Sequence, residues 1–169
     1  MADARAPTGP PPLRPFGLVL HHDGRFTHEG VPILHPRLRA AFDRAVRYLP
    51  DEDRFVVQIG RFRGQIEVEE AAFFVRDFDA ATGELSLSDA SREPLDPATL
   101  RLSPRDGALL CAVKRELVPP AGLLARFLHA AQAELLAAVE GSEDAPRLRL
   151  GGRSVALPPH LAGAPTPAN

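Results

Sequence analysis

The sequence has no tryptophan and only one cysteine, Cys111, among its 169 residues. A single cysteine excludes an intramolecular disulfide, and the absence of disulfides suits a reducing compartment, so a cytoplasmic protein is expected. Cys111 lies in the apolar run Leu109–Val113. A small buried hydrophobe is the ordinary interpretation of such a residue, and a reactive thiol is the alternative.

An excess of charge of either sign is also missing. The 20 Lys and Arg residues are balanced by 22 Asp and Glu residues, which gives a net charge of -2. Proteins that bind nucleic acids or anionic membranes through electrostatics carry an excess of basic residues. We therefore expect neither a nucleic acid nor a membrane as a partner.

No apolar run is long enough and pure enough to suggest a membrane span. The longest one, Leu117–Val139, is interrupted by Arg126 and Glu134, which favours a core helix. Residues 1–12 contain no apolar segment of the kind that secretory signals have. Because both ends are rich in Pro, Ala and Gly, residues 1–15 and 159–169 are predicted to be disordered tails.

Between these tails the hydrophobic pattern predicts an α+β fold of two related halves, residues 16–80 and 81–158. Each half is expected to be a mainly antiparallel sheet with one packed helix. Apolar residues recur at helical spacing over 36–49 and over 120–140, with Gly141 placed to cap the second helix. Strands are predicted where apolar residues alternate or cluster, at 55–59, 62–68, 72–75, 85–87, 100–102 and 108–114.

The first half opens with a predicted hairpin. Residues 17–22 and 25–28 flank the pair Asp23-Gly24, which suits a two-residue turn. That turn pairs His22 with Arg25. The face so defined carries Val19, His21, Phe26 and His28. A similar pattern around Gly151-Gly152, in a terminal hairpin at 148–157, suggests a duplicated unit.

The strand at 61–69 carries a polar row, because side chains of a strand alternate between its two faces. A solvated face with cross-strand ion pairs is one interpretation of this row. The functional interpretation is that guanidinium groups present planar forks to a phosphate or carboxylate. The residues of the row are Arg61, Arg63, Gln65, Glu67 and Glu69.

Motifs for metal binding and catalysis are absent from the sequence. Four histidines fall within residues 21–35, but their spacing matches no standard zinc pattern, and surface histidines are the preferred interpretation. The sequence has no phosphate loop, nucleophile elbow or zinc-protease signature. A Glu67 or Glu69 base with His28 as its partner is the enzymatic alternative. No metal, cofactor or catalytic residue is therefore predicted.

Two segments carry a family resemblance. Residues 23–33, Asp-Gly-Arg-Phe-Thr-His-Glu-Gly-Val-Pro-Ile, and residues 66–73, Ile-Glu-Val-Glu-Glu-Ala-Ala-Phe, resemble an uncharacterised bacterial family, catalogued as domain of unknown function twelve-eighty-five. Residues 60–63 are similar to a segment of a second uncharacterised family that has mitochondrial members. The first resemblance implies an α+β fold of two related halves, the second superficially similar to a pleckstrin-homology barrel. It also implies a ligand pocket between the halves and a signalling role. On matching positions it singles out Arg25, His28, Glu29, Glu67 and Glu69.

These observations together favour a non-enzymatic binding module. We expect it to hold a small anionic or nucleotide-like ligand between its halves in a regulatory or signalling role, with Arg25, Arg61 and Arg63 contacting the anion. A protein-interaction or scaffolding domain, in which the same arginines meet an acidic partner protein, is the alternative. A hydrolase of unknown substrate is the third hypothesis.

Overall fold

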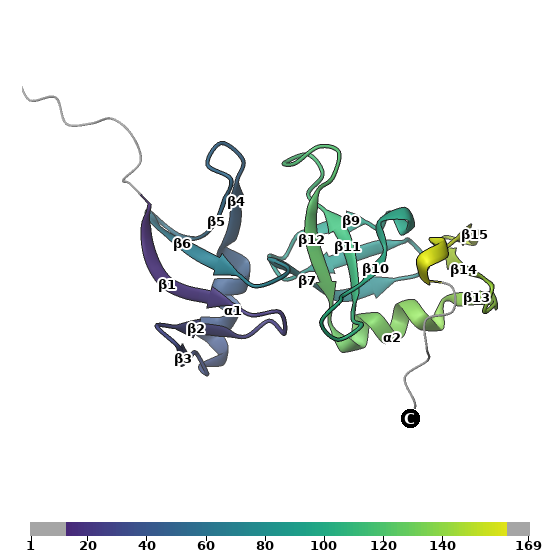
Figure 1. The fold of residues 1–169 in the computed structure, drawn as a ribbon, viewed down its shortest axis with the longest axis horizontal. Helices are drawn as coiled ribbons and strands as arrows, with labels where there is room; N and C mark the ends of the chain where they lie inside the picture. Colours follow the sequence, from purple (N-terminus) through teal and green to yellow (C-terminus); the bar gives the residue numbers. More distant parts are fainter. Residues whose placement is uncertain (1–12, 162–169) are drawn as a thin grey trace, which may run out of the picture.

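The computed structural model describes residues 13–161, which form two six-stranded sheets side by side along the long axis of the molecule (Figure 1). The first sheet has the strand order β3-β2-β1-β6-β5-β4. Helix α1 packs against it, with the rings of Phe26 and Phe42 5.5 Å apart. The elements of this half are β1 (Arg14–Leu20), β2 (Phe26–His28), β3 (Val31–Pro32), α1 (Pro36–Ala45), β4 (Val46–Leu49), β5 (Arg54–Ile59) and β6 (Phe62–Val68).

The second sheet has the order β10-β11-β12-β7-β8-β9, and helix α2 packs beneath β7 (Figure 1). A small three-stranded sheet follows α2. The elements are β7 (Phe73–Asp79), β8 (Glu84–Leu87), β9 (Arg92–Pro94), the short 3-10 helix η1 (Pro97–Thr99), β10 (Arg101–Leu102), β11 (Leu109–Val113), β12 (Leu123–Phe127), α2 (His129–Ala137), β13 (Val139–Ser142), β14 (Ala145–Leu150), β15 (Arg153–Ala156) and the 3-10 helix η2 (Pro159–Leu161).

The two large sheets share one topology. In each, three consecutive strands pair antiparallel, the next three do the same, and the first strand of the half pairs parallel with the last. These central parallel pairs are β1 with β6 and β7 with β12. The predicted α+β fold of two related halves is thus confirmed. The repeat relates β1–β6 to β7–β12. The sequence pattern instead related the first hairpin to the terminal hairpin, and this part of the prediction is wrong.

The chain passes from the first sheet to the second between Val68 and Phe73. The boundary between the two sheets therefore comes earlier in the sequence than residue 80, where the sequence pattern places the end of the first half. Most of the two predicted tails lies outside the described residues, although β1 begins at Arg14 and residues 159–161 form η2. None of the helices in the described range 13–161 is long and apolar enough to cross a membrane.

Both predicted helices are shorter than the sequence pattern indicates. Residues 46–49 form β4 instead of the end of α1, because Val46 pairs with Val57 of β5 and both are fully buried. Residues 123–127 form β12 instead of the start of a long helix. This strand is buried on both faces between β11 and β7, and such a strand is apolar throughout, so periodicity cannot distinguish it from a helix. Gly141 lies in β13, with a φ of 96°, and caps no helix.

The β1–β2 hairpin differs from its predicted register by one residue. Its turn contains three residues, because the amide of His21 donates to the carbonyl of Arg25 (2.9 Å). Gly24 adopts a φ of 82°, and Asp23 Oδ1 accepts the amide hydrogen of Arg25 (3.0 Å). A change of one residue exchanges the two faces of a strand pair. His21 therefore lies beside Thr27, and the residues that face the core are Leu18, Leu20 and Phe26.

One hydrophobic core extends through both halves and includes Leu20, Phe73 and Phe127. Cys111 is fully buried in it, as predicted. Burial raises the pKa of its thiol to about 12, so the thiolate needed for reactivity does not form near neutral pH.

Candidate functional site

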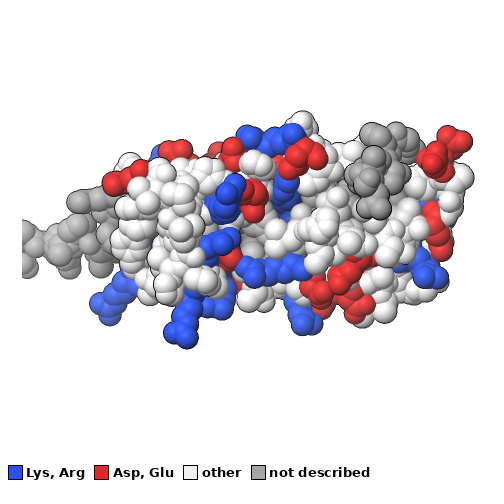
Figure 2. All heavy atoms as spheres, turned by 90° about the horizontal axis from the view of Figure 1, so that it is seen from below, with Lys and Arg blue, Asp and Glu red and all other residues white. Residues whose placement is uncertain are grey.

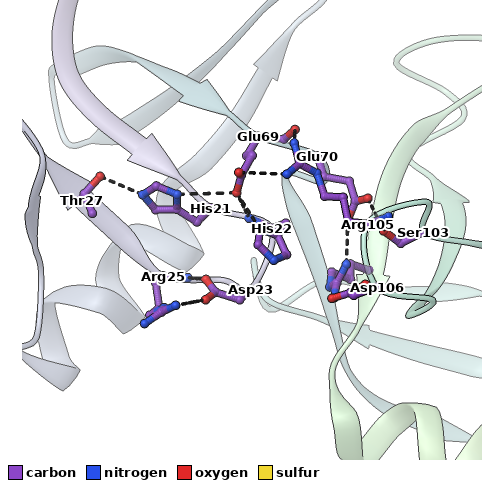
Figure 3. A network of polar contacts seen from close by, with 11 residues as sticks. His21, His22, Asp23, Arg25, Thr27, Glu69, Glu70, Ser103, Arg105 and Asp106 are labelled. Carbon is purple, nitrogen blue, oxygen red and sulfur yellow. Dashed lines mark hydrogen bonds and ion pairs between the residues drawn. The ribbon is translucent and has the colours of Figure 1, made fainter. Parts of the chain in front are cut away.

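The two halves meet at a network of charged side chains that we call the junction (Figure 3). From the first half come the β1–β2 turn and the segment Glu69-Glu70, which links β6 to β7. From the second half comes the turn between β10 and β11, together with Arg126 of β12. The β1–β2 turn also touches the second half through Gly24, where an added Cβ would lie 3.5 Å from the ring of Phe74.

Glu69 connects the two halves directly. Its Oε2 accepts hydrogen bonds from the backbone amide of His22 and from the imidazole of His22, both 2.8 Å long. Its Oε1 pairs with Arg105 of the second half at 3.1 Å (Figure 3). These hydrogen bonds from His22 and the charge of Arg105 lower the pKa of Glu69 to about 2. The carboxylate is therefore charged at all ordinary pH values, and it holds the turn of one half against a turn of the other.

This lowered pKa predicts how stability depends on pH. A carboxyl group whose pKa falls on folding stabilises the native state above its ordinary pKa, and that contribution is lost as the pH falls toward the folded value. We expect the stability difference between wild type and Glu69→Gln to shrink as the pH falls from about 5 to about 2. Urea unfolding of both proteins at several pH values in this range measures the difference in their free energies of unfolding. Glu67→Gln, at an exposed position of β6, is the control and should retain the wild-type profile. A constant difference for Glu69→Gln would contradict the assignment.

Glu70 faces the second half and forms a buried ion pair. Its Oε2 lies 2.8 Å from Arg126, and its Oε1 accepts the Ser103 hydroxyl at 2.5 Å. The side chains of Arg126 and Glu70 are only 9% and 8% exposed. Arg126 also bonds Asp106, and this bond lowers the pKa of the Asp106 carboxyl. Arg126 is thus shared between one buried and one exposed carboxylate.

A groove of about 920 Å³ opens beside this ion cluster. It runs through the second half between the β10–β11 turn, α2 and the terminal hairpin. Its charged lining residues are Asp23 of the first half, Asp106 and Arg126, and we call this its charged end. His129 and Gln132 add polar groups to its lining. The rest of its walls is mainly apolar and is formed by Leu100, Leu102, Leu109, Phe127, Leu128, Leu135, Leu136, Val139, Pro146, Leu157 and Leu161. A second cavity of about 380 Å³, between α2 and the turn at Ala80, is smaller.

Two of the predicted site residues lie at the junction. Glu69 is its central carboxylate, and Arg25 bonds Asp23 through Nε at 2.6 Å with its side chain 73% exposed. Asp23 reaches the groove, but Arg25 and Glu69 do not line it.

The other predicted residues lie apart from the junction. Arg61 is exposed in the β5–β6 turn, Arg63 pairs with Glu52 at 3.1 Å, and Glu67 is exposed on β6. The ring of His28 packs on Phe16, and Glu29 holds a φ of 48° after β2. None of these five residues lines either cavity.

The sequence pattern did not indicate the charged residues that the second half contributes to the junction, Arg105, Asp106 and Arg126. Arg126 was noted only as an interruption of an apolar run. A charged residue inside such a run is itself a signal, because a buried charge needs a partner. Nothing in the sequence indicates that the partners are Glu70, 56 residues away, and Asp106.

One arrangement at the junction has the order of a catalytic triad. His21 lies between Thr27 Oγ1 (2.9 Å from its Nε2) and Glu69 Oε2 (3.6 Å from its Nδ1) (Figure 3). The second distance is too long for a hydrogen bond, and the same oxygen is already engaged by His22. The arrangement therefore favours a structural role over hydrolysis.

A second polar cluster surrounds Lys114, the single lysine of the chain. Its ammonium group lies 3.1 Å from Asp89, 2.9 Å from Glu93 and 2.5 Å from the hydroxyl of Ser91. The pKa of Lys114 is raised, because the hydrogen bonds that its ammonium group donates to Glu93 and Asp89 outweigh the effect of burial. A protonated lysine cannot serve as the base for Ser91, so this cluster holds β11 against the β8–β9 hairpin.

Charges of both signs are mixed on the face seen in Figure 2, and no basic stripe of the kind that nucleic acids require runs along that face. Among residues 13–161, no group of three or more His, Cys, Asp or Glu side chains could hold a metal ion.

Comparison with solved structures shows which known proteins have a similar fold. No family model and no curated protein matches the sequence. The structure is similar to that of a DUF1285 family protein from Silicibacter pomeroyi DSS-3, with a TM-score of 0.58 and 20% identity over 91% of this chain and 90% of that one. A DUF1285 family protein from Shewanella baltica OS155 has a TM-score of 0.48 and 16% identity, over 72% of this chain and 91% of that one. The predicted resemblance to domain of unknown function twelve-eighty-five is therefore confirmed in the fold.

Proposed function

We propose that this chain, which shares its fold with a DUF1285 protein, is a binding module for a small apolar molecule with an anionic end. The observation that carries the proposal is the groove of about 920 Å³ that ends at the junction. Ligand pockets usually measure about 300–1,000 Å³ and combine apolar walls with a few polar groups. A groove of the second half that ends where the two halves meet, against Asp23 of the first half, suits a regulatory or signalling role.

The walls of the groove favour an apolar body for the ligand. Leucine side chains line it, among them Leu100 after η1, Leu109 of β11 and Leu135 of α2. The exposed fraction of Leu136 is 50% and that of Leu102 is 36%, so a bound apolar chain would remove these residues from water. A nucleotide would instead place a polar ribose and base against these leucines. We therefore favour an aliphatic or aromatic acid.

The charged end of the groove carries Asp23 and Asp106 beside Arg126, so we propose that an anion binds there by exchange with Asp106. An incoming carboxylate can exchange with Asp106 on Arg126, because the Asp106 side chain is 42% exposed and can turn into water. An incoming cation would draw Asp106 away and leave the buried guanidinium of Arg126 with fewer acceptors, which is costly. Gln132 accepts the amide hydrogen of Leu109 through Oε1 (3.0 Å), which leaves its amide nitrogen as a donor beside the groove.

Isothermal titration calorimetry with four probes tests the proposal. Decanoate should bind, decanol should bind more weakly because it lacks the anionic end, and decylamine and AMP should bind weakest. The double variant Arg61→Gln/Arg63→Gln should leave decanoate affinity unchanged, because neither residue lines the groove. Absence of binding by decanoate and decanol alike would overturn the proposal. Loss of AMP binding in the double variant would instead support the anion site predicted from the strand pattern.

A protein-interaction domain is the second candidate. Arg25 is 73% exposed and Arg61 is exposed in the β5–β6 turn, so both could meet an acidic surface of a partner protein. Cross-linking in the native host with wild type and with Arg25→Gln/Arg61→Gln tests it. A partner lost in the variant supports this role, and the same cross-links in both proteins contradict it.

A further inference from the structure

Asp106 occupies the position at which an anionic ligand would have to bind. It lies in the turn between β10 and β11, at the charged end of the groove, and its Oδ2 bonds Arg126. Its side chain is 42% exposed, whereas that of Arg126 is 9% exposed. Arg126 keeps its buried partner Glu70 when Asp106 leaves. Asp106 is therefore the more exposed of the two carboxylates that pair with Arg126, and its other bond, from the amide of Ala108 to Oδ1, is 3.2 Å long.

We infer that Asp106 occupies the anion-binding position on Arg126 in the free protein, and that the carboxylate of a bound ligand displaces it from there. This inference rests on the proposed function and specifies the ligand class as carboxylic acids. Exchange of one carboxylate for another preserves the charge beside the buried guanidinium, so the ligand need not overcome an unpaired buried charge. The apolar part of the ligand then supplies the net gain in binding.

Displacement of Asp106 would be transmitted to the junction. The neighbouring residue, Arg105, pairs with Glu69 at 3.1 Å, and Ser103 of the same turn bonds Glu70 at 2.5 Å. Arg105 and Asp106 are neighbours in one turn (Figure 3), so a backbone change in that turn on displacement of Asp106 would reach the Arg105–Glu69 pair. Occupancy of the groove would thus loosen the contact between the two halves, and a binding event would become a change in how they are held together.

The affinity of Asp106→Asn for decanoate tests the inference. Removal of the competing charge should raise decanoate affinity by about tenfold, because one charge-assisted hydrogen bond no longer has to be replaced. The affinity for decanol should stay the same, because an alcohol leaves Asp106 in place. A residue with only a structural role would lower both affinities together when it is substituted.

A second measurement uses the wild-type protein and does not depend on how the variant folds. In the free protein the bond from Arg126 lowers the pKa of Asp106. Carboxyl carbon NMR should show this pKa rising toward its ordinary value when decanoate saturates the groove, and remaining low with decanol.

The outcomes separate this inference from the proposed function. If decanoate and decanol bind but Asp106→Asn leaves decanoate affinity unchanged or lower, the displacement is wrong and the groove is still a binding site. An unchanged pKa of Asp106 in the decanoate complex leads to the same conclusion. If neither probe binds wild type, both proposals fall.

Discussion

Replacement of Arg126 by methionine should lower the free energy of unfolding by about 3–5 kcal/mol, the largest stability change we expect from one substitution. The variant leaves Glu70 as a charge only 8% exposed, and it removes the hydrogen bond that holds Asp106. The cost arises from the unpaired buried carboxylate more than from the lost attraction. Urea unfolding at neutral pH measures the effect.

Two matched variants separate this cause from a loss of packing. Glu70→Met/Arg126→Met removes both buried charges, and it should recover most of the lost stability because no buried charge is left unpaired. Arg92→Met breaks an exposed pair with Glu84, whose side chains are 69% and 43% exposed, and should cost less than about 1 kcal/mol. If the double variant were as unstable as Arg126→Met, the loss would come from packing.

Filling the groove should have the largest effect on binding. Ala108 lines the groove at the end of the β10–β11 turn, and in Ala108→Trp the indole should occupy part of the space that a ligand needs. We expect decanoate affinity to fall by at least about thirtyfold, since roughly 2 kcal/mol of apolar contact is lost. Calorimetric titration measures it.

Ala121→Trp is the matched control. Ala121 is exposed in the connection between β11 and β12, at the opposite end of β11 from the β10–β11 turn (Figure 1), and it does not line the groove. This variant carries the same indole and should bind decanoate like wild type. Equal loss in both variants would show that the effect of Ala108→Trp is not specific to the groove.

Alternation and turn residues were sufficient to predict most strands but not their register. The apolar alternation at 55–59 and 62–68 matches β5 and β6. The hairpin at Asp23-Gly24 was also predicted, yet the sequence does not state whether its turn has two residues or three. That single residue decides that His21 faces Thr27 and that Phe26 enters the core.

The error in the second half has a different cause. Residues 123–127 are apolar on both faces because they form a strand in the middle of a sheet, and their pattern continues without a break into α2. Local sequence cannot show that β12 pairs parallel with β7, more than 40 residues earlier. Long-range pairing of this kind also fixes Arg126 next to Glu70, and so it positions the candidate site.

The candidate site was predicted only in part for the same reason. Strand alternation predicted Arg61 and Arg63 on one face, but Arg61 lies in the β5–β6 turn ahead of β6, and Arg63 forms an ion pair with Glu52 of the β4–β5 turn. Glu69 was singled out from its place in a motif, and its partner Arg105 comes from the other half. A site assembled from two halves depends on contacts that a strand pattern does not contain.

A crystal structure of the protein with decanoate tests the central claim most directly. We predict that the aliphatic chain lies along Leu102 and Leu136, with its carboxylate bonded to Arg126 and Asp106 turned into solvent. A groove that stays empty at saturating decanoate, or a ligand bound at the β5–β6 turn beside Arg61, would contradict the account.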